Sequence, residues 1–532
     1  MTEANGIHEE RNDVAALLGR DEPWDIVIIG GGITGAGVLR EAAREGYRAL
    51  LVEQRDFAWG TSSRSSKMVH GGLRYLASGD YRLTRDAVHE RERMMNEAPG
   101  LVDNLYYIMP HFRRQFPGPG LFGLLLRLYD FLAQRRTRRF FPGESVLHWV
   151  PGLRRQGLRG GTRFSDAVTD DARLVLRILQ EATAAGGRAL NYVRAESVTP
   201  PGDAGEGRVT VHDELAGTHY ELRARHIVHA TGAWTDRLRG QLGAEQRIRP
   251  LRGSHLVFPF WKLPVSVSLS LIHPRDHRPM FVYPWEGVTV VGTTDLDHDE
   301  DLQKEAVLSR DEMEYLLEAV HDAFPDAHLG EADLISTWSG VRPVVSDGDG
   351  RKKKPSSEKR EHVIWNDRGV ISVAGGKLTT FRLIALEVLD HLRTDNGARR
   401  EVDDRVFSPA PATARPKELT AWQWRRLRGH YGNRVGEVIE AGPLSPIGHT
   451  DTLMAELAWS CRHEQVGHLD DLLLRRTRLG LLLPEGGAPW LDAIREHCQP
   501  ILGWDDDRWQ RECSRYRDLW RASYHLPPEP GT

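Results

Sequence analysis

The hydrophobic pattern near the N-terminus is that of a strand–helix–strand unit. The apolar run of residues 25–29 ends at three glycines, small and apolar residues at helical spacing continue to about Glu45, and a second apolar run, 49–52, ends at Glu53. Short apolar runs closed in this way are typical of parallel strands that are buried on both faces. The pattern therefore predicts the start of a parallel sheet covered by helices.

The rest of the chain predicts two more domains. Runs at 226–232 and 370–376 also end in glycine, so we expect them to join the first sheet from distant parts of the sequence. From 250 to 294, short Val-, Ile-, Phe- and Tyr-rich runs broken by Pro and Gly predict an antiparallel sheet. Leu, Trp and Arg at helical spacing over 418–525 predict a helical domain after a proline-containing linker at 399–416.

Composition narrows the class of protein. At roughly 150 residues per domain, 532 residues make three or four domain-sized units. The 71 Lys and Arg against 75 Asp and Glu give a net charge of −4, which argues against a globally basic nucleic-acid-binding protein. The polar, acidic N-terminus lacks a signal-peptide pattern, and no long apolar stretch predicts a membrane-spanning helix. Cys461, Cys498 and Cys513 form no CxxC pair, so we expect a reduced compartment and no metal site.

The turn after the first strand carries a phosphate-binding pattern. Gly30, Gly32 and Gly35 match GxGxxG between a predicted strand and a predicted helix, and Glu53 stands at the end of the next strand. Glycines let the backbone approach a pyrophosphate at a helix N-terminus, and the carboxylate of Glu53 can accept hydrogen bonds from ribose hydroxyls. A glycine turn needed only for packing is the alternative. An acid at position 53 disfavours a 2′-phosphate and so NADP, whereas NAD and FAD stay open.

The stretch 61–75, TSSRSSKMVHGGLRY, combines hydroxyls, cations, a histidine and a glycine pair just after this unit. Hydroxyls and glycine backbone suit a pyrophosphate and a flat ring, and Arg74 suits an anion. A solvated serine-rich loop is the alternative. The glycine pair and the proximity to Glu53 favour a binding role.

Several motifs together resemble one family. GGGITGAG, SSKMVHGGLRYL, LRGSHLVFP, SGVRP and GGKLTTFR occur in this order, and the resemblance covers nearly the whole chain after residue 24. The sequence resembles the aerobic, FAD-dependent glycerol-3-phosphate dehydrogenases among the D-amino-acid-oxidase-like flavoproteins. The resemblance implies FAD rather than NAD, oxidation of sn-glycerol 3-phosphate to dihydroxyacetone phosphate, and electron delivery to a membrane quinone.

The candidate site residues follow from the motifs and from the resemblance. A neutral imidazole at His255 can accept a hydroxyl proton, although a purely structural histidine is the alternative. Arg342 and Lys377 are cations suited to an anionic substrate, with simple surface solvation as the alternative, and the resemblance places both at the substrate with Arg74 and Tyr75. The expected cofactor contacts are Gly30, Gly32, Gly35, Glu53, Ser62, Ser63, Lys67, His70, Gly71, Gly72, Gly232, Gly375, Gly376 and Leu378.

The expected fold is α/β, with a Rossmann-like FAD-binding domain assembled from discontinuous segments, an antiparallel-sheet substrate domain and a helical C-terminal cap. We place the N-terminal extension at 1–24, the FAD-binding domain at 25–110, 160–245 and 341–398, the substrate domain at 111–159 and 246–340, the linker at 399–416 and the cap at 417–532. The acidic run 295–299 lacks the glycine and the terminal acid of a calcium loop. Trp422, Trp424, Trp504 and Trp509 are expected to anchor a helical core rather than to bind nucleic acid.

Residues 111–142 predict a membrane contact. Seven arginines against one aspartate give this segment a charge of 7 − 1 = +6, and ten large apolar residues lie between the arginine clusters. Such a segment is too short to span a bilayer but suits its surface, whereas a buried core helix is the alternative. We expect peripheral attachment at the inner face of the cell membrane. The alternative function is an oxidase that uses oxygen and, more distantly, a non-catalytic dinucleotide-binding protein. The sequence leaves open whether the chain forms homo-oligomers. It also leaves open the roles of the cap, the N-terminal extension and the 346–360 loop.

Overall fold

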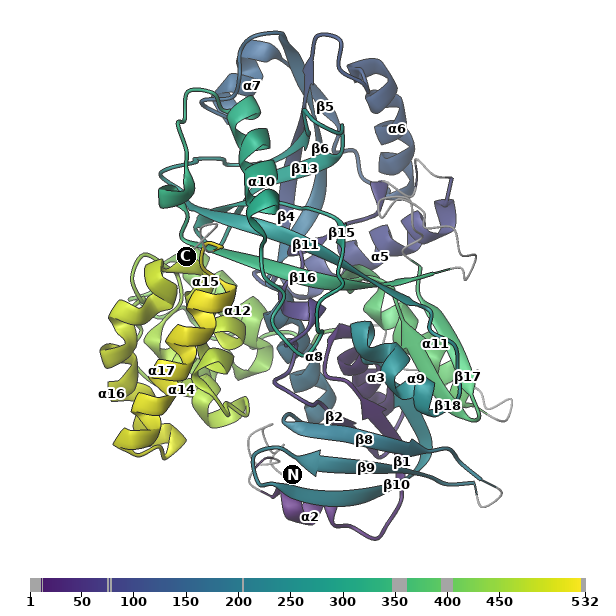
Figure 1. Cartoon of the computed structure of the whole chain (residues 1–532). Coiled ribbons are helices and arrows are strands. Elements are labelled where there is room, and N and C mark those ends of the chain that lie inside the picture. The colour runs from purple at the N-terminus through teal and green to yellow at the C-terminus, as the bar shows by residue number, and fades with distance from the viewer. Residues whose placement is uncertain are drawn as a thin grey trace.

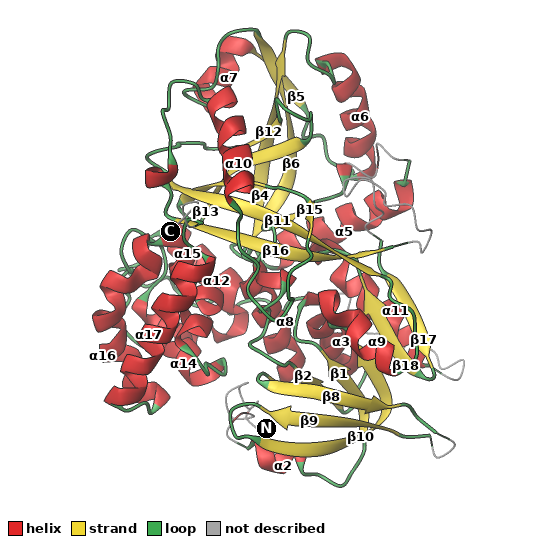
Figure 2. Cartoon of the chain, viewed as in Figure 1, coloured by secondary structure: helices red, strands yellow, loops and turns green. Residues whose placement is uncertain are grey.

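The computed structural model describes residues 11, 13–73, 76, 79–202, 205–346, 361–393 and 405–527. Two sheets and a helical C-terminal domain make up this part of the chain, as Figures 1 and 2 show. The expected fold class is therefore confirmed. Among the described residues, every helix is too short or too polar to span a bilayer. The N-terminal extension contributes one short helix, α2 (Val14–Leu18), which packs near β10.

The first sheet is assembled from distant segments, as predicted. Its central strands are parallel: Ile26 pairs with His226 on one side and with Ala49 on the other. Strands β9 and β8 extend the sheet beyond β10 as an antiparallel flap at the bottom of Figure 1. The strands are β17 (Val363–Asp367), β18 (Val370–Ala374), β10 (Thr218–His229), β1 (Trp24–Ile29), β2 (Ala49–Val52), β7 (Arg188–Leu190), β8 (Val193–Thr199) and β9 (Gly207–Asp213).

Three helices cover one face of this sheet. Helix α3 (Ile33–Arg44) packs between α8 (Asp171–Ala184) and α11 (Phe381–Leu392). Close approach needs small residues here, because a Cβ at Gly37 would lie 2.8 Å from the ring of Phe381. The apolar sides of the helices and the inner strands form one buried core. This core fixes the loop between β1 and α3, where the candidate site lies.

The second sheet is mostly antiparallel and lies above the first in Figure 1. The predicted runs 280–284 and 288–291 form the paired strands β13 and β14. Helices α5 (Tyr81–Glu97), α6 (Pro119–Leu132), α7 (Gly143–Trp149) and α10 (Arg310–Ala323) flank it. The strands are β15 (Leu296–Asp297), β11 (Ile248–Pro259), β14 (Val288–Gly292), β13 (Pro279–Trp285), β12 (Ser268–Ile272), β4 (Val102–Phe112), β6 (Leu158–Thr169), β3 (Met68–Val69), β16 (Ser336–Val345) and β5 (Arg139–Pro142).

The sheets divide the chain at other positions than the expected boundaries. Strands β4 and β6, and β16 with the SGVRP motif, belong to the second sheet, although 25–110, 160–245 and 341–398 were assigned to the first domain. Local pattern shows that a segment is a strand, whereas the partner is set by contacts far away in sequence. The linker is described only from 405 onward, and the predicted loop 346–360 lies outside the described residues except for Ser346.

The C-terminal domain is helical, as predicted. Its core is continuous with one face of the second sheet. It also docks on the first domain through buried charges, since both terminal nitrogens of Arg476 donate to Asp56 at 2.7 Å. Trp424, Trp504 and Trp509 are buried as expected, but Trp422 is 52% exposed and anchors no core. Its α-helices are α12 (Ala421–Tyr431), α13 (Val435–Glu440), α14 (Met454–His463), α15 (Leu479–Leu482), α16 (Leu491–Leu502) and α17 (Asp506–Ser523).

Candidate functional site

The loop between β1 and α3 is built so that only glycine fits at two positions. Gly30 has φ +114°, and a Cβ there would lie 2.5 Å from the carbonyl oxygen of Ala230. A Cβ at Gly35 would lie 1.9 Å from the carbonyl oxygen of Gly30. Helix α3 begins at Ile33, so its first N–H groups point toward the loop. This is the geometry that accepts a pyrophosphate at a helix N-terminus.

Glu53 lies against this loop. Its carboxylate accepts hydrogen bonds from the backbone N–H of Gly31 at 2.6 Å and of Arg55 at 2.9 Å. Desolvation raises the pKa of Glu53, although these two N–H groups stabilise the charged form. The side chain also lines the cavity described next, where a ribose hydroxyl can reach it. Its contact with ribose stays a prediction.

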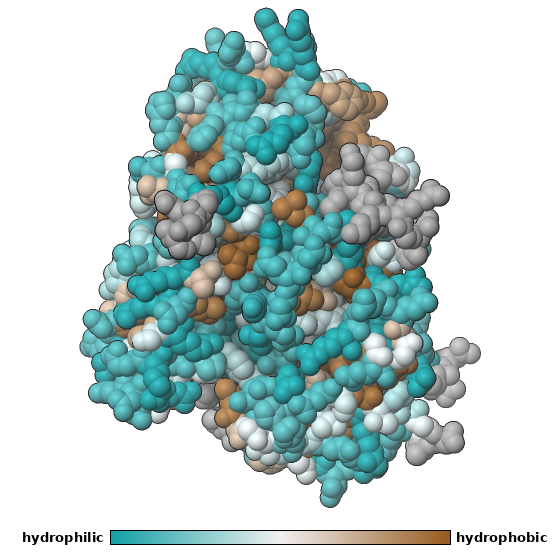
Figure 3. Space-filling model, in the orientation of Figure 1, coloured by the Kyte–Doolittle hydropathy of each residue, from teal (hydrophilic) through white to brown (hydrophobic). Residues whose placement is uncertain are grey.

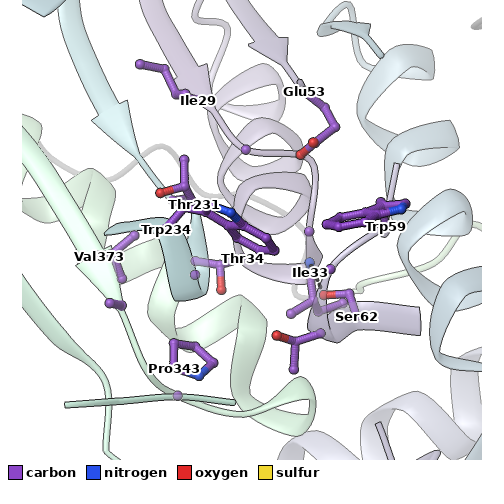
Figure 4. Close-up of a pocket in the computed structure, with 18 of the residues that line it drawn as sticks. Ile29, Ile33, Thr34, Glu53, Trp59, Ser62, Thr231, Trp234, Pro343 and Val373 are labelled. Carbon is purple, nitrogen blue, oxygen red and sulfur yellow. Dashed lines mark hydrogen bonds between the residues drawn. The ribbon is translucent and has the colours of Figure 1, made fainter. Parts of the chain in front are cut away.

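A cavity runs from the glycine loop toward the second sheet, and Figure 4 shows its lining. Three motifs far apart in the sequence meet here: the turn after β10, Pro343 of SGVRP, and the turn after β18. A Cβ added at Gly232 would lie 3.9 Å from the ring of Pro343, so the turn after β10 lies beside strand β16. The lining comes from segments 29–34, 52–54, 59–65, 230–238 and 373–378, with Ala195 and Pro343.

The cavity also has an aromatic lining that the sequence did not reveal. Trp59 and Trp234 lie with ring centroids 5.7 Å apart and planes tilted by 49°. The indole N–H of Trp59 donates to Glu305 at 3.0 Å, from a loop of the second domain. Arg237 of α9 (Thr235–Gln241) lines the same cavity. The ATGAWTD motif contains Trp234, and its place two residues after Gly232 is the signal in the sequence that points to it.

The serine-rich stretch divides between the cavity and the interior. Ser62 lines the cavity, and its hydroxyl oxygen accepts from the N–H of Ile33 at 3.0 Å. Lys67 is completely buried and donates to the carboxylate of Asp171 at 3.0 Å and to the carbonyl oxygen of Ser63 at 3.1 Å. Burial lowers the pKa of Lys67 to about 8, with Arg478 acting in the same direction. Lys67 therefore belongs to a buried ion pair and not to the cavity wall.

His70 and Gly71, which follow the serine-rich stretch, each form a backbone hydrogen bond to a residue far away in sequence. The carbonyl oxygen of His70 accepts from the hydroxyl of Thr379 at 3.2 Å, which ties this stretch to the GGKLTT turn. The N–H of Gly71 donates to Asp166 at 2.8 Å. Neither residue lines the described cavity. His70 therefore ties the two parts of the site together, whereas Gly71 is held within the second sheet.

His255 lies on β11, where the second sheet meets the serine-rich stretch. Its Nε2 is 2.9 Å from the hydroxyl oxygen of Ser66, and its ring stacks on Trp338 with centroids 4.7 Å apart. Burial, together with Arg342 and Lys67, holds the pKa of His255 well below its usual range. The imidazole is therefore neutral, the form of the ring that carries a free nitrogen lone pair.

Arg342 lies on β16, and a buried carboxylate orients it. Its guanidinium donates to Asp295 at 3.2 Å and to the hydroxyl of Thr293 at 3.2 Å. The same carboxylate forms an ion pair with Arg278 at 3.2 Å. The side chain of Asp295 is 1% exposed, whereas that of Arg342 is 23% exposed. Asp295 thus holds two guanidinium groups at the edge of the site.

The structure brings most of the predicted residues to one place. His255 and Arg342 lie near the cavity without lining it: His255 contacts Ser66, the residue after the lining residue Ser65, and Arg342 precedes the lining residue Pro343. Gly35, Ser63, Lys67, His70, Gly71 and Gly72 do not line the cavity. Arg74 and Tyr75 lie outside the described residues. Those that line the cavity are Gly30, Gly32, Glu53, Ser62, Gly232, Gly375, Gly376, Lys377 and Leu378.

Comparison with known families agrees with this geometry. The profile of the FAD dependent oxidoreductase family matches residues 25–382, and that of the C-terminal domain of alpha-glycerophosphate oxidase matches residues 395–509. The aerobic glycerol-3-phosphate dehydrogenase of Staphylococcus haemolyticus is 34% identical over 517 residues, which cover 91% of this chain and 92% of that protein. Glycerol-3-phosphate dehydrogenase 2 of Mycobacterium tuberculosis is 33% identical over 522 residues, with 93% and 88% coverage.

Solved structures show the same fold. The glycerol-3-phosphate dehydrogenase from Bacillus halodurans, complexed with FAD, superposes with a TM-score of 0.76 at 25% identity and covers 99% of both chains. The L-alpha-glycerophosphate oxidase from Mycoplasma pneumoniae, with FAD bound, gives a TM-score of 0.59 at 17% identity and covers 73% of this chain and 99% of that one.

Proposed function

Because this chain belongs to the FAD-dependent oxidoreductase family, among the glycerol-3-phosphate dehydrogenases, we propose that it oxidises sn-glycerol 3-phosphate to dihydroxyacetone phosphate and passes the electrons to a membrane quinone. FAD is its cofactor. One observation carries the proposed chemistry: a buried neutral imidazole, His255, and an oriented guanidinium, Arg342, lie near the cavity that begins at the glycine loop. His255 contacts Ser66, the residue after the lining residue Ser65, and Arg342 precedes the lining residue Pro343. A proton acceptor and an anion-binding group are what this oxidation requires.

Each residue of the site has a separate role in the proposed reaction. FAD, when bound, supplies the acceptor for the hydride that leaves C2 of the substrate. His255 accepts the proton of the C2 hydroxyl, so that the carbonyl forms as C–H and O–H bonds break. Arg342 and Lys377 bind the anionic substrate and orient C2, with Arg342 held in place by Asp295. Orientation and removal of water are the contributions of the protein.

Helix α6 supports the proposed attachment to a membrane surface. Phe122, Leu126 and Tyr129 pack inward, so the alternative of a core helix holds for one side of α6 only. On its other side large apolar side chains are exposed, and Figure 3 shows the resulting apolar surface over α6 at the upper right. The exposed residues of the segment include Phe116 (77%), Leu121 (52%), Leu124 (60%), Phe131 (76%) and Phe140 (49%).

Arginines surround this apolar surface. Arg127, Arg136, Arg138 and Arg139 line one hollow beside Leu124. The single acid of the segment, Asp130, is paired with Arg138 at 2.9 Å, so the segment keeps most of its positive charge. Apolar side chains flanked by arginine suit the headgroup region of an anionic bilayer. Because quinone is confined to the lipid, we propose peripheral attachment here, on the cytoplasmic face.

Co-sedimentation with anionic liposomes tests the attachment. A variant with Arg135, Arg136, Arg138 and Arg139 replaced by Gln should leave the pellet at moderate salt, because each arginine near an anionic surface contributes about 1 kcal/mol. Equal pelleting of this variant and the parent would contradict the proposal. The matched control replaces four exposed arginines on α17, Arg508, Arg511, Arg517 and Arg521, and should pellet like the parent.

Reoxidation distinguishes quinone from oxygen as the acceptor. The Mycoplasma protein of similar fold is an oxidase, so oxygen is the specific alternative. Enzyme reduced anaerobically by glycerol 3-phosphate is mixed with a short-chain quinone or with oxygen, and the return of the flavin absorbance is followed. We expect fast reoxidation by quinone and slow reoxidation by oxygen. The reverse order, with hydrogen peroxide formed at each turnover, would make the enzyme an oxidase.

A further inference from the structure

The antiparallel flap formed by β8, β9 and β10 carries two histidines side by side on its outer face. His212 of β9 is the direct register partner of His219 of β10. The two imidazole rings have centroids 4.4 Å apart and are tilted by 31°. Directly opposed side chains on antiparallel strands have Cβ atoms about 4.5 to 5.5 Å apart, a spacing from which two imidazoles can share one ion.

A bulge in β8 brings a carboxylate to the same place. Ala195 pairs with Val211 and Ser197 pairs with Thr210, so Glu196 is an extra residue with no partner position on β9. Such a bulge redirects a side chain. The carboxylate of Glu196 lies 3.4 Å from Nε2 of His219. One nitrogen of each histidine and one oxygen of Glu196 all lie within 4.8 Å of one another.

The charge of the cluster is compatible with a cation. Glu196 and Glu214 provide two negative charges and Arg194 one positive charge, so the cluster has a net charge of −1 when both histidines are neutral. Arg194 contacts both carboxylates, Glu196 at 2.9 Å and Glu214 by a hydrogen bond. When Glu196 binds an ion, Arg194 still has Glu214 as its ion-pair partner. The exposed fractions of 18% for His212 and 60% for His219 leave an open route to the ligand atoms.

We propose that Glu196, His212 and His219 bind a divalent transition-metal ion such as Zn²⁺, which cross-links strands β8, β9 and β10. Two imidazoles and a carboxylate, completed by water, form a tetrahedral set that suits zinc and not calcium or magnesium. The sequence predicted no metal site because the three ligands come from three strands and form no motif.

The site borders the cofactor cavity. Ala195, the residue before Glu196, lines the cavity. The carbonyl oxygen of Glu196 accepts from the side chain of Gln241 at 2.9 Å, at the end of α9, whose Arg237 and Leu238 line the cavity too. An ion on Glu196 therefore restrains a segment that lines the cofactor cavity, and this consequence holds whichever substrate the enzyme oxidises.

Calorimetric titration of the tag-free, FAD-loaded protein with Zn²⁺ tests the proposal. We expect one site that His212→Ala and His219→Ala each weaken by at least about tenfold. His89→Ala, an exposed histidine of α5, is the matched control and should bind like the parent. Co²⁺ in place of Zn²⁺ should give the visible absorbance of tetrahedral coordination in the parent and not in His219→Ala.

Removal of the positive charge of Arg194 gives a sharper test of the Zn²⁺ affinity. Arg194→Gln should tighten Zn²⁺ binding by about three- to tenfold, because it removes a positive charge close to the ion and frees Glu196. A Zn²⁺ ion bound away from this cluster would not respond in this way. The proposal is overturned if the parent binds no Zn²⁺, or if His212→Ala and His219→Ala both keep the parent's affinity.

Discussion

The cofactor side and the substrate side of the cavity differ in what faces the ligand. On the cofactor side the cavity begins at the glycine loop between β1 and α3, whose spacing leaves no room for a Cβ at Gly30 or Gly35. On the proposed substrate side, near this cavity, lie the titratable side chain of His255 and the charged side chain of Arg342, each placed by a different strand of the second sheet. We expect the first side to determine affinity for FAD and the second to determine the rate and its pH dependence. Changes on either side should therefore produce separable effects.

The largest expected effect is on the substrate side, at His255. His255→Asn removes the proton acceptor, and we expect kcat for glycerol 3-phosphate to fall by about 100- to 10,000-fold while flavin content stays at the parent's level. Steady-state kinetics with a dye acceptor measure it. An unchanged kcat would show that His255 is not the proton acceptor. It would also show that the two sides of the cavity do not differ in the way described.

The same residue predicts an unusual pH profile. The pKa of His255 is held well below its usual value of 6.5, so the neutral base persists as the pH falls through 6.5. We expect kcat at saturating substrate to stay nearly level from about pH 8 to about pH 6. An acid limb centred near pH 6.5 would show that the base is not buried beside Arg342 and Lys67.

The next effect concerns Arg342. Arg342→Leu should lower kcat/KM by about 10- to 200-fold, the cost of a charge-assisted hydrogen bond of 1.5 to 3 kcal/mol, without loss of FAD. Arg342→Lys keeps the charge but not the fork of donors and should recover part of the loss. Normal kcat/KM in the leucine variant would remove Arg342 from the substrate side.

On the cofactor side, Glu53→Ala should raise the Kd for FAD by about tenfold and leave kcat of the reconstituted enzyme unchanged. The reason is the loss of a carboxylate that holds Gly31 and faces the cavity. Flavin release after gel filtration and fluorescence titration measure it. Glu53→Gln, which keeps an acceptor, is the control, and full flavin retention by the alanine variant would contradict the role of Glu53.

The smallest effect separates positioning from binding. Asp295→Asn keeps the shape of the side chain but removes the charge that orients Arg342 and Arg278. We therefore expect kcat/KM to fall by about three- to tenfold, mainly because KM rises. The same change combined with Arg342→Leu should add little, because the two residues act as one unit. Full additivity in this double-mutant cycle would contradict the positioning role.

Sequence predicted one side of the cavity better than the other, for a physical reason. The glycine loop, Glu53 and the parallel strands are local or repeat a known spacing, so β1, α3 and β2 match the prediction closely. The membership of β4, β6 and β16 in the second sheet depends on long-range pairing, as does the meeting of Trp59 with Trp234. Lys67 was expected at the cofactor, but its buried pairing with Asp171 depends on α8 and on Arg478 of the C-terminal domain.

Anaerobic reduction of the bound flavin by sn-glycerol 3-phosphate tests the central claim most directly. The purified protein should be yellow, and substrate in the absence of oxygen should bleach the flavin with formation of one dihydroxyacetone phosphate for each flavin reduced. His255→Asn should retain the yellow colour and bleach far more slowly. Parent protein that holds FAD but stays oxidised with excess glycerol 3-phosphate would contradict the assignment of the substrate.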